Sequence, residues 1–289
     1  YGLACLFWAL AFLLSYAFIT HDFSNKYVST YSDRGMPLFY LLASFWGGEK
    51  GALLFWVTSL TTFCAISIHS NRRKNLSWIG CSLGVLLLCI AFFVLLMVFE
   101  SNPFATFLTF GGPADGQGLN PLLQNPVMTI HPPSLLTGYI TFSIPFAYGV
   151  GALMTGKLDT EWIQVTRFWT IVSWLFLSLG LILGGAWAYQ ELGWGGYWMW
   201  DPVENVSIVP WFTCAALLHG LMLQRGNKSM VRFNLFWGAM TFLFAYYATF
   251  FTRTGLLGAV AESSVHTFGF SATGYWLLGL MIAYTIGTC

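Results

Sequence analysis

The sequence predicts an all-α fold, a polytopic helical bundle that is integral to a membrane. Of its 289 residues, 57% are hydrophobic and only 8% are charged, whereas about a quarter of the residues in a soluble domain are charged. The mean hydropathy is +0.67, and the apolar residues lie in long runs without the alternation of a porin. In lipid, such runs satisfy their backbone groups as helices. The net charge of +1 argues against a nucleic-acid partner.

Eight apolar stretches are predicted to be helical crossings. The segment MPLFYLLASFWGG at 36–48, between the first two, is too short to span and is predicted to be re-entrant or interfacial. The last stretch has only about fifteen apolar positions where a crossing needs roughly 20, so we expect the chain to be a fragment of a longer protein. No soluble domain fits, and 1–289 is predicted to be a single transmembrane domain. The stretches are about 1–20, 52–69, 76–98, 135–154, 168–188, 207–223, 233–251 and 275–289.

Lysines and arginines divide unevenly between two sets of connections, which predicts the orientation in the membrane. One set carries Arg72, Arg73, Lys74, Lys157, Arg167, Arg225, Lys228 and Arg232. The other set carries only Lys26, Arg34, Lys50 and Arg253. The positive-inside rule places the first set in the cytoplasm or its organellar equivalent. The outer connections are longer and contain the Gly, Pro and Trp motifs, so the function is expected to face outward.

An unusually aromatic segment, WGGYWMWDPVEN at 194–205, lies in the outer connection between the fifth and sixth crossings. Trp and Tyr also collect at membrane interfaces as anchors, but such anchors are scattered over several helix ends. Here they are clustered beside glycines that let the backbone approach a ligand closely. We therefore interpret the loop at 187–206 as the binding surface of a large flat apolar ligand. Its aromatic members are Trp187, Trp194, Tyr197, Trp198 and Trp200.

The end of this segment has the pattern of a helix start. Asp201 is expected to be the N-cap, Pro202 the first helical residue, and Glu204 the partner in a capping box. On this interpretation both carboxylates satisfy backbone donors at the start of the sixth helix. Capping does not exclude a second role, so a place for Asp201 and Glu204 in the ligand site stays open.

The six cysteines all fall within apolar runs and form no CxxC pair. A disulfide framework or a zinc site is therefore not predicted, and buried packing is expected for these thiols. CxxCH is absent as well, so the chain is not itself a c-type cytochrome.

The aromatic segment resembles the tryptophan-rich WWD signature of the haem-handling proteins of cytochrome c maturation. Its DPVEN ending is similar to the CcmF-type haem lyases and their NrfE-type relatives within that superfamily. The resemblance covers essentially the whole chain, because the similar segments follow one another in the same order. They are HDFSNKYV (21–28), FWGGEKGALLFW (45–56), DGQGLNPLLQNP (115–126), HPPSLLTGY (131–139) and FFTRTGLLGAVAESSVHTF (250–268).

Two histidines, His131 and His266, fall in outer connections close to the membrane surface. Pro132 and Pro133 follow His131 directly, which predicts an extended residue at the mouth of a helix that starts behind it. Two neutral imidazoles on opposite faces of a flat ligand suit haem iron, although a lone interfacial histidine is often only solvated. The resemblance implies that His131 and His266 bind the iron of the substrate haem.

His219 falls within the sixth crossing, about twelve residues and roughly 18 Å from its predicted start. An ionisable group at such a depth indicates a functional site; a hydrogen-bonded core histidine is the alternative. The resemblance implies that His219 binds a b-type haem, which keeps the substrate iron reduced with electrons from quinol. No other histidine in the sequence suits as its partner, so either the second ligand lies beyond Cys289 or the b-type haem is absent.

Arg253 is the outer cation that we expect to meet a haem propionate. Charge-assisted pairing with a carboxylate is strong near a site of low dielectric constant. An ordinary interfacial arginine, whose charged end reaches water, is the alternative.

The resemblance implies cytochrome c biogenesis, with the chain acting as a cytochrome c haem lyase. Haem from a carrier protein is held at the outer face, and its vinyl groups form thioether bonds with the CxxCH thiols of apocytochrome c. A partner lyase subunit, quinol and membrane lipid complete the expected partners. The implied location is the bacterial cytoplasmic or mitochondrial inner membrane, with the site facing the periplasm or intermembrane space. Three alternatives stay open: an NrfE-type lyase for an unusual haem-binding motif, a CcmC-type haem exporter or carrier-loading protein, and a structural subunit of a respiratory assembly.

Overall fold

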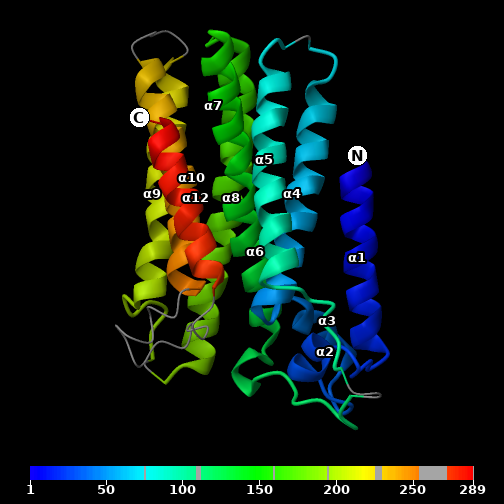
Figure 1. Ribbon diagram of the computed structural model, residues 1–289. Coiled ribbons are helices and arrows are strands. Elements are labelled where there is room, and N and C mark those ends of the chain that lie inside the picture. Colours follow the sequence, from blue (N-terminus) through cyan, green and yellow to red (C-terminus); the bar gives the residue numbers. More distant parts are fainter. Residues whose placement is uncertain are drawn as a thin grey trace.

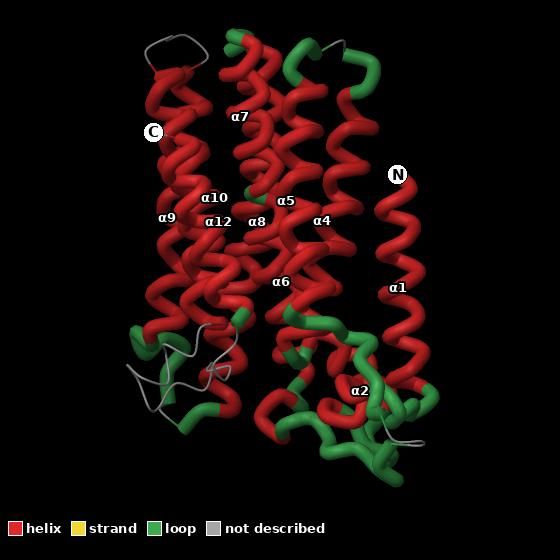
Figure 2. The backbone as a smooth tube through the Cα atoms, viewed as in Figure 1, coloured by secondary structure: helices red, strands yellow, loops and turns green. Residues whose placement is uncertain are grey.

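Long helices lie side by side and make up most of the molecule (Figure 1). In the described part of the chain the secondary structure is helical, apart from an isolated bridge between Asn25 and Thr106 (Figure 2). The predicted all-α membrane fold is therefore confirmed. The computed structural model describes residues 1–74, 76–108, 112–158, 160–193, 195–224, 230–253 and 272–288, with the backbone alone at 160 and 285–288.

Among the described residues, seven spans are long and apolar enough to cross a membrane. They are formed by α1 (Gly2–Ile19), α4 (Glu49–Asn71), α5 (Ile79–Phe99), α6 (Pro126–Thr141) together with α7 (Ser143–Thr155), α8 (Thr160–Glu191), α9 (Pro202–Leu223) and α10 (Met230–Arg253). These spans agree with the first seven predicted crossings. The eighth corresponds to α12 (Thr273–Thr288), which at 16 residues is shorter than a full crossing requires.

The helix ends fall into two groups at opposite ends of the bundle. The end of α4 and the start of α5, the end of α7 and the start of α8, and the end of α9 and the start of α10 lie together at the top of Figure 1. The short helices α2 (Lys26–Tyr31) and α3 (Leu38–Ala43) lie at the bottom. This grouping agrees with the two sets of connections that differ in their content of Lys and Arg.

The short outer helices are tied to the start of α4 through Tyr27 in α2. Its hydroxyl accepts a hydrogen bond from the backbone N–H of Gly48 at 3.0 Å. Burial raises the pKa of Tyr27 above its ordinary value, so the phenol stays neutral and keeps its proton for donation. α3 and the 3-10 turn η1 (Ser44–Trp46) are too short to span, in agreement with the predicted interfacial segment. The carbonyl acceptors of the Tyr27 hydroxyl are Ser44, Phe45 and Gly48, at 3.3, 3.1 and 3.2 Å.

α6 and α8 cross at very short range because glycines lie at their contact. A Cβ atom at Gly138 would come within 2.6 Å of the backbone nitrogen of Leu177, and one at Gly180 within 2.6 Å of the Cα of Leu135. Small residues at a spacing of four let helix backbones approach one another in membranes. The crossing brings His131 of α6 directly against α8.

The start of α12 is held by two carboxylates from other elements. Glu49, the first residue of α4, accepts hydrogen bonds from the hydroxyls of Ser101, at 3.0 Å, and Thr273. Glu100 accepts one from the indole N–H of Trp276 at 3.1 Å. Charged acceptors make the stronger hydrogen bonds, so these contacts fix the outer end of α12 against α4 and the end of α5.

Candidate functional site

A crevice of about 380 Å³ lies among the outer ends of α4, α6, α9 and α10. Apolar side chains form most of its wall, among them Trp46, Leu135 and Val206. Its few polar groups include the imidazole of His131 and the guanidinium of Arg253. Apolar walls with a small number of placed polar groups are typical of cofactor and ligand sites.

His131 lies inside α6, in the second turn of the helix, and the sequence-based prediction that it precedes the helix is wrong. Asn125 caps α6 by accepting two backbone N–H groups, and Pro126 takes the first helical position, where a missing N–H has no cost. Pro132 and Pro133 are interior prolines of the same helix. The helix starts at Asn125 and Pro126, before Pro132 and Pro133, which were predicted to start it.

The imidazole of His131 is half-buried between the crevice and α8. Its Nδ1 lies 2.7 Å from the carbonyl oxygen of Gly180. A carbonyl oxygen only accepts, so Nδ1 carries a proton, and in the neutral form of the ring the lone pair is on Nε2. Metal-binding histidines commonly donate their other ring N–H to a carbonyl in this manner.

Trp187 forms part of the crevice wall and is almost completely buried, with 2% of its surface exposed. Its indole N–H donates to the carbonyl oxygen of Leu122, at 3.0 Å, in the 3-10 turn η2 (Pro121–Leu123). Val127 and Met128 of α6 pack against the small buried cluster that Trp187 forms with Ala188 and Leu192. The indole therefore joins α8 to the outer connection and closes one side of the crevice.

The other described aromatic residues of the loop do not line the crevice. Trp200 is 70% exposed and has a φ of +57°, and Trp198 lies edge-on to it with 6.0 Å between ring centroids. Tyr197 stacks on Tyr189 of α8 at 4.5 Å. Trp194 lies outside the described residues. The aromatic set that was predicted to form one surface is thus divided between the crevice wall and the outside of the protein.

Asp201 and Glu204 form the predicted capping box at the start of α9. The Asp201 carboxylate accepts from the N–H of Val203 at 2.9 Å. Glu204 accepts from the N–H groups of Asp201, at 3.1 Å, and Met199, at 2.9 Å. The capping interpretation is confirmed, and the box fixes the end of the aromatic loop beside Val203, which lines the crevice.

Replacing Asp201 with alanine is expected to lower the free energy of unfolding by about 1 kcal/mol, because the cap is lost. Asp201→Asn should keep this stability, since asparagine caps as well as aspartate. The measurements are thermal unfolding and haem titration of the purified protein. Haem binding that survives in Asp201→Asn assigns the carboxylate to capping alone. An Asp201→Asn protein of normal stability that no longer binds haem contradicts this.

Arg253 is the last residue of α10, and only 5% of its surface is exposed. The carboxylate of Glu49 interacts with it electrostatically, and the end of a helix favours a cation. Thr249 and Thr252 line the same wall, with their hydroxyls bonded to carbonyl oxygens of α10. Arg253 is therefore a buried cation at the crevice and not an arginine whose charged end reaches water.

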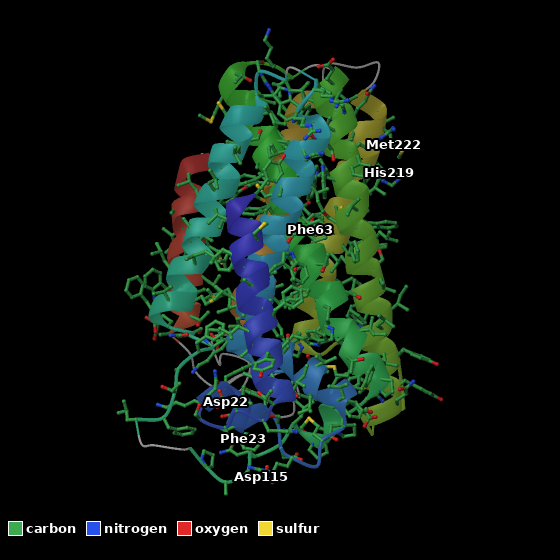
Figure 3. All side chains as sticks on the ribbon, turned by 90° about the vertical axis from the view of Figure 1, so that its right-hand side faces the viewer. Asp22, Phe23, Phe63, Asp115, His219 and Met222 are labelled. Carbon is green, nitrogen blue, oxygen red and sulfur yellow. The ribbon has the colours of Figure 1, made fainter. Side chains whose placement is uncertain are left out.

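His219 lies on the side of α9 that faces away from the bundle, beside Met222 (Figure 3). Its Nδ1 is 2.7 Å from the carbonyl oxygen of Ala215 in the same helix. α9 begins at Pro202, before the predicted start of the crossing, so His219 lies roughly 25 Å along the helix and one turn from its end at Leu223. The predicted depth of roughly 18 Å is counted from the predicted start of the crossing at 207, and it stays a prediction. His266 lies outside the described residues.

Two glycines of α8 that were not predicted from the sequence lie close to parts of the site. A Cβ at Gly184 would come within 2.6 Å of the His131 ring, and one at Gly185 within 2.8 Å of the Tyr197 carbonyl oxygen. The run GLILGG at 180–185, with small residues four apart in an apolar stretch, is a signal of close approach. The run indicates that another helix approaches closely here, but it does not indicate which residue occupies the space beside the glycines.

The chain is similar in sequence to known proteins. Residues 46–257 match the family model of the cytochrome C assembly protein. The chain belongs to this family. The cytochrome c-type biogenesis protein NrfE of Haemophilus influenzae is 40% identical over 275 residues, which cover 94% of this chain and 42% of that protein. For the cytochrome c-type biogenesis protein CcmF of Escherichia coli, the identity is 40% over 269 residues, covering 92% of this chain and 40% of that protein.

The fold agrees with a solved structure of a family relative. The cytochrome c heme lyase CcmF superposes with a TM-score of 0.72 at 30% sequence identity, covering 97% of this chain and 44% of that one. The chain therefore spans about two fifths of the length of the curated relatives. Among the described residues no three His, Cys, Asp or Glu side chains lie together as a metal site. Haem iron does not need such a cluster, because the protein supplies only its axial ligands. An imidazole such as that of His131 can be one of them.

Proposed function

We propose that the protein is a cytochrome c haem lyase, which holds haem at the outer face of the membrane and promotes its attachment to the CxxCH segment of apocytochrome c. The observation that carries this proposal is the meeting of His131 and Arg253 in one apolar crevice beside Trp187. An imidazole suits the iron, and an arginine suits a propionate. The names of the relatives, which specify cytochrome c-type biogenesis and a heme lyase, support the same activity.

In this proposal His131 and His266 bind the substrate iron, and Arg253 pairs with a propionate. The vinyl groups face the thiols of the apocytochrome. Each S–H adds across a vinyl C=C: sulfur bonds one carbon, the proton goes to the other, and no atom or electron leaves. The chain orients the substrates and excludes water, because the reacting thiols belong to the apocytochrome. Trp187, in the crevice wall, is proposed to contact the macrocycle. For the other residues of the aromatic loop a role in haem binding stays a prediction from the sequence; they are Trp194, Tyr197, Trp198, Trp200, Asp201 and Glu204.

His219 is proposed to bind a second, b-type haem on the side of α9 that faces away from the bundle. Its exposure on that face and its ionisable ring in an apolar helix support a ligand role. The other described histidines lie elsewhere: His21 in the connection after α1, His69 in α4 and His131 in α6. The second ligand is therefore expected outside the described residues. When bound, this haem would pass electrons from quinol to keep the substrate iron reduced.

The proposed partners are a haem carrier protein, apocytochrome c and a partner lyase subunit. The proposed location is the bacterial cytoplasmic or mitochondrial inner membrane, with the crevice towards the periplasm or intermembrane space. The concentration of Lys and Arg at the end of the bundle opposite the crevice supports this orientation.

Deletion of the protein separates a lyase from the alternatives. Without a lyase, haem-loaded carrier is expected to accumulate while apocytochrome c receives no haem. Without a carrier-loading protein the carrier itself stays empty, and without a structural subunit holocytochrome still forms. Haem staining and intact-mass measurement of carrier and cytochrome distinguish these results. A cytochrome whose CxxCH cysteines are replaced by serine is the control for covalent attachment.

A further inference from the structure

We propose that Gly180 and Gly184 of α8 are positioning residues for His131. The carbonyl of Gly180 holds the proton on Nδ1, and the bare Cα of Gly184 sets where the ring lies. Together they make Nε2 the atom that the protein presents to iron. The proposal rests on the proposed function, in which His131 binds the substrate haem.

The hydrogen bond to Gly180 selects one tautomer of His131. At 2.7 Å the Nδ1–carbonyl contact is short, and the acceptor has no proton of its own to give. The tautomer with its lone pair on Nδ1 would set that lone pair against the carbonyl oxygen, so it is disfavoured. Donation to a carbonyl also raises the basicity of the other ring nitrogen, which strengthens Nε2 as a ligand.

Gly184 provides the space that the ring occupies. A Cβ at this position would lie 2.6 Å from Cε1, 3.0 Å from Nδ1 and 3.3 Å from Nε2 of His131. Gly180 and Gly184 are four residues apart, so they share one face of α8. The ring cannot move away from an added methyl group without lengthening its hydrogen bond to Gly180.

The contacts of Gly184 differ from those of the glycines that serve helix packing. Gly138 and Gly180 face the backbone of the opposite helix, as expected where small residues bring two helices together. The three atoms nearest to a Cβ at Gly184 all belong to the His131 imidazole. A methyl group at 184 therefore tests the position of the ring, and a methyl group at 138 tests the crossing.

The experiment is a titration of the purified whole protein with ferrous protohaem, in a His219→Ala background that removes any haem on α9. Absorption spectra give the affinity and the fraction of low-spin iron. Gly184→Ala is expected to weaken binding about tenfold or more, the effect of disturbing the support of a metal ligand. It should also convert low-spin iron to high-spin. Gly84→Ala in α5, where a Cβ meets nothing within 4 Å, is the control for the substitution itself and should bind haem normally. Gly138→Ala, which disturbs the crossing that places His131, shows the effect of a change in helix packing.

Soluble imidazole distinguishes a role through His131 from a role in packing. In His131→Gly, added imidazole should restore low-spin iron, and the further change Gly184→Ala should then have no effect. If the tenfold loss persists in the double variant, or if Gly84→Ala weakens haem binding as much, Gly184 does not act through His131 and the proposal is overturned. If Gly184→Ala alone does not fold, recovery of folding in the double variant supports the proposal, and continued misfolding overturns it.

The same titration separates this inference from the proposed function. If His131→Ala leaves haem binding unchanged, the ligand assignment fails and the inference fails with it. If His131→Ala loses haem while Gly184→Ala binds it normally, only the positioning role is wrong.

Discussion

Replacement of His131 with alanine is expected to reduce holocytochrome c formation by about a hundredfold, the cost of losing the orientation of a substrate whose reaction depends on placement. The imidazole enters the crevice from a rigid helix, and its Nδ1 is already bonded to Gly180. Water or a neighbouring side chain would not reproduce that geometry. The measurement is haem-stained cytochrome yield in cells that contain the variant as their only copy.

Two comparisons make this result specific. His69→Ala should mature cytochrome normally, because His69 is exposed on α4 and bonds Tyr1 and Arg72. His266→Ala should fail like His131→Ala, with haem-loaded carrier accumulating in both. If both His131→Ala and His266→Ala give normal yields, the lyase mechanism is wrong.

Replacement of Arg253 with methionine is expected to weaken haem binding by between about ten- and a hundredfold, since a hydrogen bond to a charged group contributes about 1.5–3 kcal/mol. Arg253 is buried at the crevice, and methionine keeps much of its length without the charge. Arg253→Lys should recover only part of the affinity, because lysine lacks the planar fork that binds a carboxylate at two points.

The ligand supplies the control for this prediction. Haem dimethyl ester has no propionate charge, so it should bind the Arg253→Met protein and the unchanged protein equally well. An equal loss for haem and its ester would show that Arg253 supports the fold through Glu49 and does not bind a propionate. Thermal unfolding of Glu49→Gln provides the comparison for that second role.

Local signals in the sequence predicted several elements correctly. The Asp-Pro-Val-Glu run predicted the cap of α9, since the four residues contain all the groups that a capping box needs. At α6 the same kind of reasoning failed, because two Pro-containing sites compete and Asn125–Pro126 starts the helix before Pro132 is reached. The choice between such sites depends on packing of the whole helix, which no short motif contains.

In the candidate site, too, some features could be predicted from the sequence and others could not. His131 could be selected from the sequence through the family resemblance of its segment HPPSLLTGY. Arg253 could be selected as an outer cation able to pair with a propionate. The separation of Trp187 from Trp200 could not be predicted, because the sequence placed both in one aromatic loop, whereas α8 continues to Glu191 and contains Trp187. One became buried when α8 packed on α6, and the other stayed outside.

The sequence by itself determined the class of the protein, since the lengths of the apolar runs and the scarcity of charge are properties of composition and spacing. It also determined the set of polar residues available for a ligand. Only the tertiary structure decided which of them meet: α6 and α8 approach at Gly138 and Gly180, and this contact brings His131 against Gly184. Such a meeting depends on the relative position of helices that are far apart in the chain, and a local pattern carries no information about that distance.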